Sequence, residues 1–584
     1  MSMTTLITLR FVSIFAAYTG LTVLLPAIMF RRILAGRGLS EQFLMCYTFG
    51  NFYIINIVFA VQLLHISGFW TLVLFTAVPG ILIWSRVNRV SLRELCMKTG
   101  IVCKKILQGS MGIKGFLYRV KNRSMAVLKK AVWLFYCEVV CNTLQWILAG
   151  AVIAALFWIY GRQLVLTYGY RASDIPVHLN WINQMSRGNL FASGVYPFGF
   201  HCMVYYLHAV FGFDTYVILC VFYLVQVFFI YIVLLAMLKL LCRSLYLPYA
   251  GIMVYILGSF WARQTYSRFG SSLPQEFGMI FVIPSVYFLI RFFQTEKKNL
   301  KNRETRLILG CFALAFSLTL AIHFYGTMIA GLCCIGIAVG FCTRFLNKEY
   351  FRRIMLTGII SVFLAVLPMG IAFAGGTPLQ GSLGWGLSVI NGGKDDETEA
   401  TDSLVENTEL STISESEGTE NRDGGSTVSA SQVEALKKAA EEKLAEPAKE
   451  QQKPLKERLK EKFAAVRSSI RVNVMNVKPY IVEITLGSIV LLAALGSLMV
   501  LLREIDFAGV IFSTAFYLLC MCCLQCASLL HLPALMDPNR CSIFLCYSVC
   551  FSWTLGADAI VHLLIRWWKK RWVSNVASIL TLVI

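Results

Sequence analysis

The first residues that could do chemistry are a carboxylate and a histidine four positions apart, Asp174 and His178. In a helix this spacing places both side chains on one face. A carboxylate there could act as a general base that takes the proton of an acceptor hydroxyl and so strengthens the nucleophile. The pattern also has a structural interpretation. Ser173 or Asp174 followed by Pro176 is typical of a helix start, where the carboxylate caps backbone N–H groups.

Three further histidines lie in apolar surroundings. His201 and His208 are seven positions apart and could project from one helix face to bind a phosphate, a sugar hydroxyl or a metal. The alternative is that they anchor that helix in the lipid headgroup layer. His323 ends an apolar segment close to Tyr325, a position that is also typical of a packed histidine.

Two pairs of opposite charge complete the candidate set. Arg268 and Glu276 lie within the segment RFGSSLPQE, and Asp537 precedes Arg540 by three residues. An arginine suits a phosphate because its planar guanidinium donates two parallel hydrogen bonds. A local Asp537–Arg540 ion pair that only fixes a turn is equally compatible with the pattern.

These residues stand in a chain with the composition of a membrane protein. It has 584 residues, 57% of them hydrophobic and 15% charged, with repeated apolar runs long enough to span a bilayer as helices. The net charge of +21 comes from Lys and Arg residues that gather between those runs. This is the positive-inside pattern of membrane topology, and it argues against nucleic-acid binding. The nineteen cysteines lie mostly inside apolar runs, not at the spacings of a disulfide framework.

The sequence predicts an all-α, polytopic transmembrane helix bundle of about 13 spans, with the N-terminus outside the cytoplasm. The expected spans cover residues 5–30, 42–65, 69–85, 131–160, 215–240, 246–262, 277–293, 306–322, 326–343, 354–374, 480–502, 507–529 and 541–566. The motif GIAVG, from Gly336 to Gly340, is a GxxxG pattern that indicates close helix packing.

Four regions follow from this topology. Residues 1–130 comprise the N-terminal spans and a basic cytoplasmic connection from Arg86 to Lys130, either an interfacial helix on anionic lipid or a solvated loop. Residues 131–375 form a core with a large external loop, 161–213, whose segment 197–212 should be a helix at the membrane interface. Residues 376–479 are an extracytoplasmic insert, expected to be disordered in its acidic first part and semi-helical in its second. Residues 480–584 hold the C-terminal transmembrane helices.

The same topology places the candidate polar residues on one side of the membrane. Expected at the extracytoplasmic face are Asp174, His178, His201, His208, Arg268, Glu276, His323, His531, Asp537 and Arg540.

The segments SDIPVHLNWINQM and GVYPFGFHCMVYYL resemble the first large external loop of GT-C-type polytopic membrane glycosyltransferases. The later segments GSSLPQEFG and MDPNR are similar to those of uncharacterised bacterial membrane proteins of that kind. The resemblance covers about residues 131–375 and 480–566. It implies that Asp174 takes the place of the catalytic carboxylate and that Arg540 and Arg268 are candidates to bind a lipid phosphate. The paired acids of that family are missing, because no second carboxylate adjoins Asp174.

The resemblance implies a glycosyltransferase of the cell membrane that moves a sugar from a polyprenyl-phosphate donor to a glycan, lipid or protein acceptor in cell-envelope assembly. Asp174 is the expected catalytic residue, and His178, His201, Arg268, Glu276, His323, Asp537 and Arg540 are the expected substrate-binding residues. A divalent metal is compatible with such chemistry, but no motif requires one, so the cofactor is left open. The competing hypotheses are a transporter or lipid-linked glycan flippase, and a non-catalytic membrane scaffold.

Overall fold

The computed structural model describes residues 2–110, 112–166, 168–381, 455–470, 480–533 and 535–568. The chain divides into two compact units. Unit 1 comprises Met1–Gln380, Ser469–Cys526 and Met536–Ile584, and unit 2 comprises Gly381–Ser468 and Ala527–Leu535. Most of the predicted insert, residues 382–454 and 471–479, lies outside the described residues, so its expected disorder stays a prediction. Within the described part, residues 455–470 form helix α23 (Leu455–Ile470), which starts directly after Pro454.

The described residues fold as helices. Ten helical stretches are long and apolar enough to cross a membrane. They are α1–α2 (Met3–Met29, with a π-helical turn at Gly20–Leu24), α4 (Leu39–Leu63), α5 (Phe69–Asn88), α8–α9 (Thr143–Leu166, with a π-helical turn at Phe157–Gly161), α12 (Thr215–Leu241), α15 (Pro274–Gln294), α16 (Arg303–Ile322), α19 (Lys348–Ala374), α25 (Ile505–Gln525) and α26 (Pro538–Trp568). The expectation of an all-helical, multi-pass membrane protein is therefore confirmed.

Three further apolar helices are shorter. They are α13 (Leu247–Trp261), α17 (Phe324–Gly340) and residues Thr485–Leu501 of α24 (Tyr480–Leu501). The finer expectation of about thirteen spans stays a prediction, because these three stretches are not among the ten that are long and apolar enough to cross a membrane.

The remaining helices of unit 1 connect the long ones. They are α3 (Arg31–Leu34), α6 (Leu92–Leu107), α7 (Ile113–Cys141), α10 (Ile175–Ser186), α11 (Gly199–Phe211), α14 (Arg263–Phe269) and α18 (Cys342–Phe345). No strand occurs among the described residues; Val195 and Leu379 form a single isolated parallel bridge.

Helix α15 is the most deeply buried of the ten, and it packs against α12, α16 and α17. The neighbouring pair α17 and α25 owes its close approach to the GIAVG motif. A Cβ atom at Gly336 would lie 2.9 Å from the carbonyl oxygen of Ser513, and one at Gly340 would lie 2.3 Å from that of Gly509. Only glycine permits this approach, so the prediction of close helix packing at that motif is confirmed.

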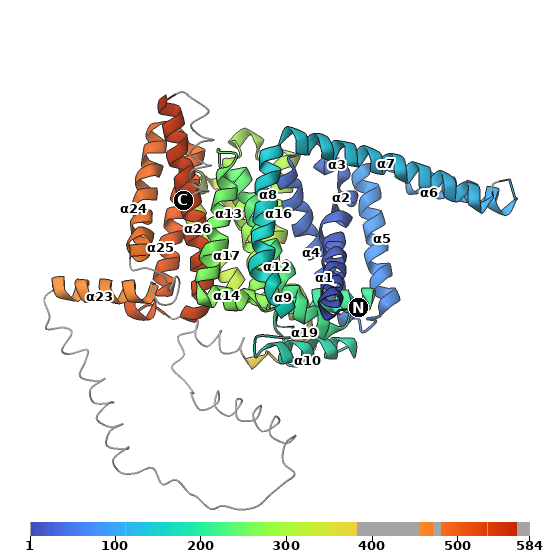
Figure 1. Cartoon of the computed structure of the whole chain (residues 1–584), viewed down its shortest axis with the longest axis horizontal. Helices are drawn as coiled ribbons and strands as arrows, with labels where there is room; N and C mark the ends of the chain where they lie inside the picture. Colours follow the sequence, from blue (N-terminus) through green and yellow to red (C-terminus); the bar gives the residue numbers. More distant parts are fainter. Residues whose placement is uncertain are drawn as a thin grey trace, which may run out of the picture. The chain divides into compact units, whose positions relative to one another are not determined.

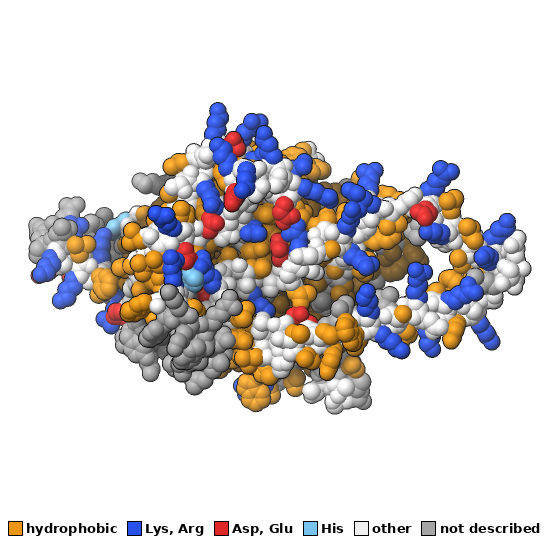
Figure 2. Space-filling view, turned by 90° about the horizontal axis from the view of Figure 1, so that it is seen from above, with side chains coloured by type: hydrophobic (Ala, Val, Ile, Leu, Met, Phe, Trp, Pro, Cys, Tyr) orange, Lys and Arg blue, Asp and Glu red, His pale blue; other side chains and the backbone are white. Residues whose placement is uncertain are grey.

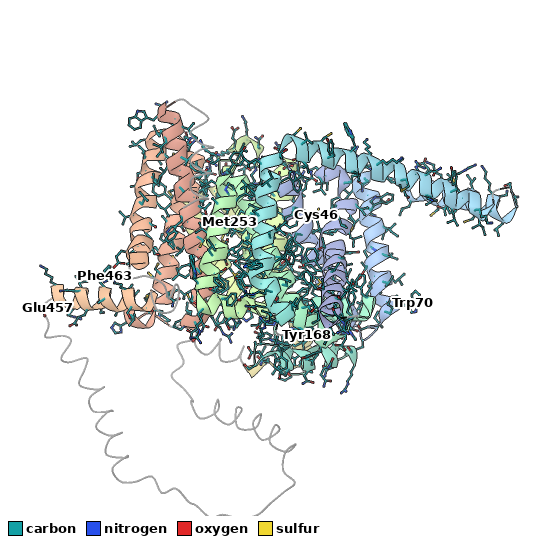
Figure 3. The ribbon with its side chains drawn as sticks, viewed as in Figure 1. Cys46, Trp70, Tyr168, Met253, Glu457 and Phe463 are labelled. Atoms are coloured by element: carbon teal, nitrogen blue, oxygen red, sulfur yellow. The ribbon has the colours of Figure 1, made fainter. Side chains whose placement is uncertain are left out.

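The long helices run side by side, and their connections gather at two ends (Figure 1). We call the end with α10 and α14 the site end; Tyr168, which lies within the predicted loop 161–213, is found there (Figure 3). We call the opposite end, with α3 and α7, the basic end. Viewed from that side, it carries many Lys and Arg side chains (Figure 2). The positive-inside rule relates the basic end to the cytoplasm.

One predicted boundary was wrong. The expected span over 131–160 begins too early, because α7 continues to Cys141 and the apolar stretch starts at Thr143 after a break at Asn142 (φ −124°, ψ 35°). Apolar residues at helical spacing in 131–141 extend the amphipathic helix, so hydrophobicity alone placed the boundary wrongly. The helix expected at the interface, α11, packs against α4, α12 and α15, with Gly199–Leu207 buried.

Candidate functional site

Asp174 occupies the N-cap position of α10, yet its carboxylate does not cap that helix. Its described partner is the hydroxyl of Ser173, which donates to Oδ1 over 3.3 Å, and the side chain is exposed. The helix starts instead on backbone geometry, with Pro176 in its first turn and the His178 N–H bonded to the Asp174 carbonyl. The capping interpretation therefore lacks the hydrogen bond that it requires. The Asp174 carboxylate is instead available to solvent or to a substrate.

His178, one turn into α10, meets His201 of α11. Nδ1 of His178 lies 3.0 Å from Nε2 of His201, so one ring donates to the other. Burial lowers the pKa of His178 to about 4, although the nearby charge of Asp174 raises it. Burial also holds the pKa of His201 well below its usual range. Both rings are therefore neutral near pH 7. The hydrogen bond between them links α10 to α11.

Aromatic rings extend this contact across the site end. Trp181 lies 5.3 Å from His201 and 6.0 Å from Tyr196, measured between ring centroids. Tyr196 in turn lies 6.4 Å from His323, the residue between α16 and α17. His323 accepts a hydrogen bond from the Tyr325 N–H through Nδ1, and burial lowers its pKa to about 3. A continuous row of rings thus joins the loop before α11 to the start of α17.

Arg268 and Glu276 form a buried ion pair. Nε of Arg268 lies 2.5 Å from Oε1 of Glu276, and Nη2 lies 3.2 Å from Oε2, so the contact is bidentate. Glu276 stands in the first turn of α15, where a carboxylate also suits the helix dipole. Burial lowers the pKa of Arg268, but the charge and hydrogen bonds of Glu276, together with the charges of Asp174 and Asp537, outweigh this effect and raise that pKa overall. The pair is a fixed element of the site wall.

Asp537 and Arg540 behave differently from each other. Oδ1 of Asp537 accepts the backbone N–H groups of Asn539 and Arg540, so Asp537 caps the first turn of α26. Within the described residues no ion pair joins the two side chains. The Arg540 guanidinium lies instead over the Tyr325 ring, 5.8 Å from its centroid, in cation–π geometry. The alternative of a local ion pair is therefore not what holds Arg540.

Tyr196 shows that Asp174 and Arg540 belong to one neighbourhood. Burial raises the pKa of Tyr196 to about 12, while the charge of Arg540 lowers it and that of Asp174 raises it. Arg268 likewise feels the charges of both Asp174 and Asp537. The ring contacts agree with this. Tyr196 lies beside His323, whose ring neighbours the Tyr325 ring under Arg540. On its other side Tyr196 lies beside Trp181 of α10, the helix whose N-cap is Asp174.

A short backbone pairing holds Tyr196 in place. The Val195 N–H donates to the Pro378 carbonyl over 2.7 Å, and the Gln380 N–H donates to the Val195 carbonyl over 3.2 Å. Gly194 precedes this pairing with φ +96°, and a Cβ there would lie 2.8 Å from the Gln380 nitrogen, so only glycine fits. The segment that follows α19 is thereby fixed against the loop that carries Tyr196.

An apolar groove runs along the outer face of α19. It has a volume of about 950 Å³ and is lined by residues of α15 to α19. Ile354 near the basic end and Ala374 near the site end both line it, and 21 residues of helix separate its ends over about 30 Å. That length matches the hydrocarbon core of a bilayer. The groove thus leads to the segment that pairs with Val195.

Of the predicted site residues, seven gather here: Asp174, His178, His201, Arg268, Glu276, His323 and Arg540. Asp537 lies close by as a helix cap, and its role as a substrate ligand stays a prediction. His208 stands apart; its Nδ1 lies 2.7 Å from the Phe213 carbonyl at the end of α11. His531 lies in unit 2. Among the described residues, no group of three His, Cys, Asp or Glu side chains is arranged to hold a metal.

Sequence reasoning missed the aromatic residues that connect the site, Trp181 and Tyr196. A signal for Trp181 was present, since it follows His178 by three positions and shares its helix face. No match to the chain was found in comparisons with protein families, with curated proteins and with solved structures.

Proposed function

We propose that the protein is a membrane glycosyltransferase that moves a sugar from a polyprenyl-phosphate donor to an extracytoplasmic acceptor. The observation that carries the proposal is a row of ring contacts between two groups of opposite charge at the site end. The row runs from α10, whose N-cap is the exposed Asp174, through Tyr196 and His323 to Tyr325, the ring under Arg540. Transfer of a sugar from a phosphate-linked donor needs a base for the acceptor hydroxyl and a cation for the departing phosphate.

The chemistry assigns each group a step. Asp174 accepts the proton of the acceptor hydroxyl as its oxygen bonds to the anomeric carbon of the donor sugar. The bond between that carbon and the phosphate oxygen breaks, and the bonding pair leaves with the polyprenyl phosphate. Arg540 stabilises the departing anion, because a guanidinium offers paired donors to phosphate oxygens. In this scheme Arg268 is already held by Glu276, so it supports the site without being the main phosphate ligand.

The apolar groove supports a donor with a long hydrocarbon chain. Its lining is almost wholly apolar, from Ile354 to Ala374 along α19, and it ends where the chain turns into the pairing with Val195. A chain bound there would deliver its headgroup to the site end. With the three shorter apolar helices included, the chain would make thirteen crossings. The positive charge of the basic end would then put that end in the cytoplasm and the site end outside it.

A transporter would need a polar path across the bilayer. The buried carboxylates of the described residues are Glu276 and Asp558, and they lie at opposite ends of the bundle, in the first turn of α15 and near the end of α26. This placement favours chemistry at one face over a route through the protein.

The test is sugar transfer by the full chain in proteoliposomes, with polyprenyl-phosphate sugars as donors. Asp174→Asn should fold and bind donor normally but turn over at least ~100-fold more slowly, since losing a positioned base typically costs that much. Near-normal transfer by this variant would remove Asp174 from the mechanism.

Asp214→Asn is the matched control. Asp214 is also an exposed carboxylate at a helix N-cap of the site end, but its Oδ1 accepts the Val217 N–H over 3.0 Å. Asn caps about as well as Asp, so this variant should keep both stability and turnover. An equal loss in the two variants would mean that the effect at Asp174 is structural.

A further inference from the structure

Helices α6 and α7 form an arm of unit 1 that makes little contact with the spans. They extend sideways from the basic end, at the level where α5 ends and α8 begins (Figure 1). α6 starts with an N-cap, in which the Ser91 hydroxyl accepts the Glu94 N–H over 3.3 Å. The arm is thus built as helix without packing against the bundle, and most of its described side chains are exposed.

The first half of α7 is amphipathic in a specific way. At 100° per residue, Ile113, Leu117 and Val120 fall on one face, and all three are exposed by 46% or more. Lys121 and Arg123 follow Val120 on its two flanks, while Asn122 points to the opposite side. A stripe of exposed apolar side chains bordered by cations on both sides is the pattern of a helix that lies in a lipid headgroup layer.

Helix α6 has a related but one-sided arrangement. Leu92, Val102 and Ile106 share one face, and they are less exposed than the lysines around them. Lys98 and Lys105 lie together on one flank of that face. The arm therefore presents a stripe on α7 with cations on both borders and an apolar face on α6 with cations on one border.

The charge of the arm identifies its partner. Residues 91–130 contain ten Lys and Arg residues and a single acid, Glu94, which gives a net charge of +9. Of the described cations in residues 91–130, only Lys98 has an ion pair, with Glu94 over 2.7 Å. Such a segment is attracted to an anionic lipid surface within about a Debye length. The arm is held at that distance, because a single residue, Asn142, separates α7 from the candidate span that begins at Thr143.

We propose that α6 and α7 bind the anionic lipid surface at the basic end of the bundle, with their apolar stripes in the headgroup layer and their cations on lipid phosphates. This interaction is independent of the proposed transferase activity, because it uses the opposite end of the molecule. Binding of the arm would therefore depend on how much anionic lipid surrounds the protein.

The test uses the full chain in nanodiscs of phosphatidylcholine alone or with added phosphatidylglycerol. A genetically encoded environment-sensitive fluorescent amino acid replaces Val120 in one variant and Asn122 in its control. Only two positions separate them, but they lie on opposite faces. With phosphatidylglycerol, the fluorophore at 120 should shift to shorter wavelength and be quenched by headgroup-level nitroxide lipids, whereas that at 122 should change little.

A second variant separates charge from hydrophobicity. Replacing Lys114, Arg119, Lys121 and Arg123 by Gln should lower the bound-to-free ratio of the arm by about 600-fold, since each of the four cations near such a surface contributes about fivefold. High salt should release the unmodified arm in the same way.

Three outcomes would overturn the proposal. The first is no lipid quenching at position 120 in anionic nanodiscs. The second is equal quenching with and without phosphatidylglycerol. The third is a shift at 120 that depends on protein concentration but not on lipid, which would indicate that a second copy of the chain covers the stripe.

Discussion

The two ends of the bundle both gather charged side chains in apolar surroundings, but they satisfy them to different degrees. At the basic end, Glu504 contacts Arg243, His562 and Arg566 at 2.5, 2.9 and 2.8 Å. Burial raises the pKa of Glu504, but these partners outweigh it and lower that pKa. Nearby, both carboxylate oxygens of the fully buried Asp558 accept backbone N–H groups, those of Arg243 and Ser244, at 2.9 Å each.

At the site end, Asp174 has a single long hydrogen bond from Ser173, and Arg540 rests on an aromatic ring without a carboxylate partner among the described residues. Buried or half-buried polar groups are normally paired within a protein. The contrast is that Glu504 and Asp558 at the basic end are held by several partners, whereas Asp174 and Arg540 at the site end are not. Under the proposed function, these two groups would be the ones that contact a ligand.

The largest expected effect comes from removing Asp558, the fully buried carboxylate at the basic end. Asp558→Ala leaves two buried N–H groups without acceptors, and each such loss costs roughly 1–3 kcal/mol, so the free energy of unfolding should fall by about 3 kcal/mol or more. Asp174→Ala should change it by less than ~0.5 kcal/mol, as for an exposed side chain. Denaturant titrations of both purified variants compare them directly. Similar losses would refute the difference between the two ends.

The second expected effect is a loss of stability in acid that originates at the site end. The pKa of His178 falls from 6.5 to about 4 on folding, so the unfolded state binds more protons between those values. The stability from the neutral ring is fully present above pH 6.5 and is lost as the pH falls, by about 2 kcal/mol at pH 5. His178→Gln should reduce this slope between pH 6.5 and 5. An unchanged slope would assign it to other groups.

The third effect is tenfold in size. If Arg540 binds the donor phosphate, Arg540→Lys should weaken donor binding about tenfold despite the retained charge, because the paired donors are lost. Arg263→Lys, an exposed arginine of α14 at the same end, is the control and should bind normally. Donor titrations by fluorescence or calorimetry measure both. Normal binding by the Arg540 variant would mean that another cation binds the donor phosphate.

The smallest effect concerns Asp537. Asn is about as good an N-cap as Asp, so Asp537→Asn should alter the free energy of unfolding by less than ~0.5 kcal/mol, and it should leave sugar transfer unchanged if Asp537 only caps α26. A clear loss of transfer with normal stability would show that Asp537 contacts substrate as well as capping α26.

Much of the site could be predicted from topology. Once Lys and Arg fixed which connections lie at the basic end, the remaining connections had to share the other, and that reasoning alone brought Asp174, Arg268, His323 and Arg540 to one end. It could not tell which of them would be paired. Arg268 found Glu276 eight residues away, whereas Arg540, three residues from Asp537, did not pair with it.

Side-chain partners were beyond the sequence because they depend on packing across helices that are distant in the chain. The His178–His201 contact and the row of rings through Tyr196 arise where α10, α11 and the start of α17 meet. Periodicity also failed at α7, since an amphipathic surface helix and the beginning of a span have similar apolar content over eleven residues, 131–141.

The pairing of Val195 with the segment after α19 also bears on the order of synthesis. Tyr196 is translated well before Leu379, and Arg540 emerges only with the final long helix. A ribosome-bound chain that has inserted α10 and α11 therefore carries Asp174 beside an unfinished wall, and contacts of such large sequence separation form late. Under the proposed function, the transfer site would be complete only after α26 had been synthesised and packed, so a chain that lacked α26 would be inactive in sugar transfer.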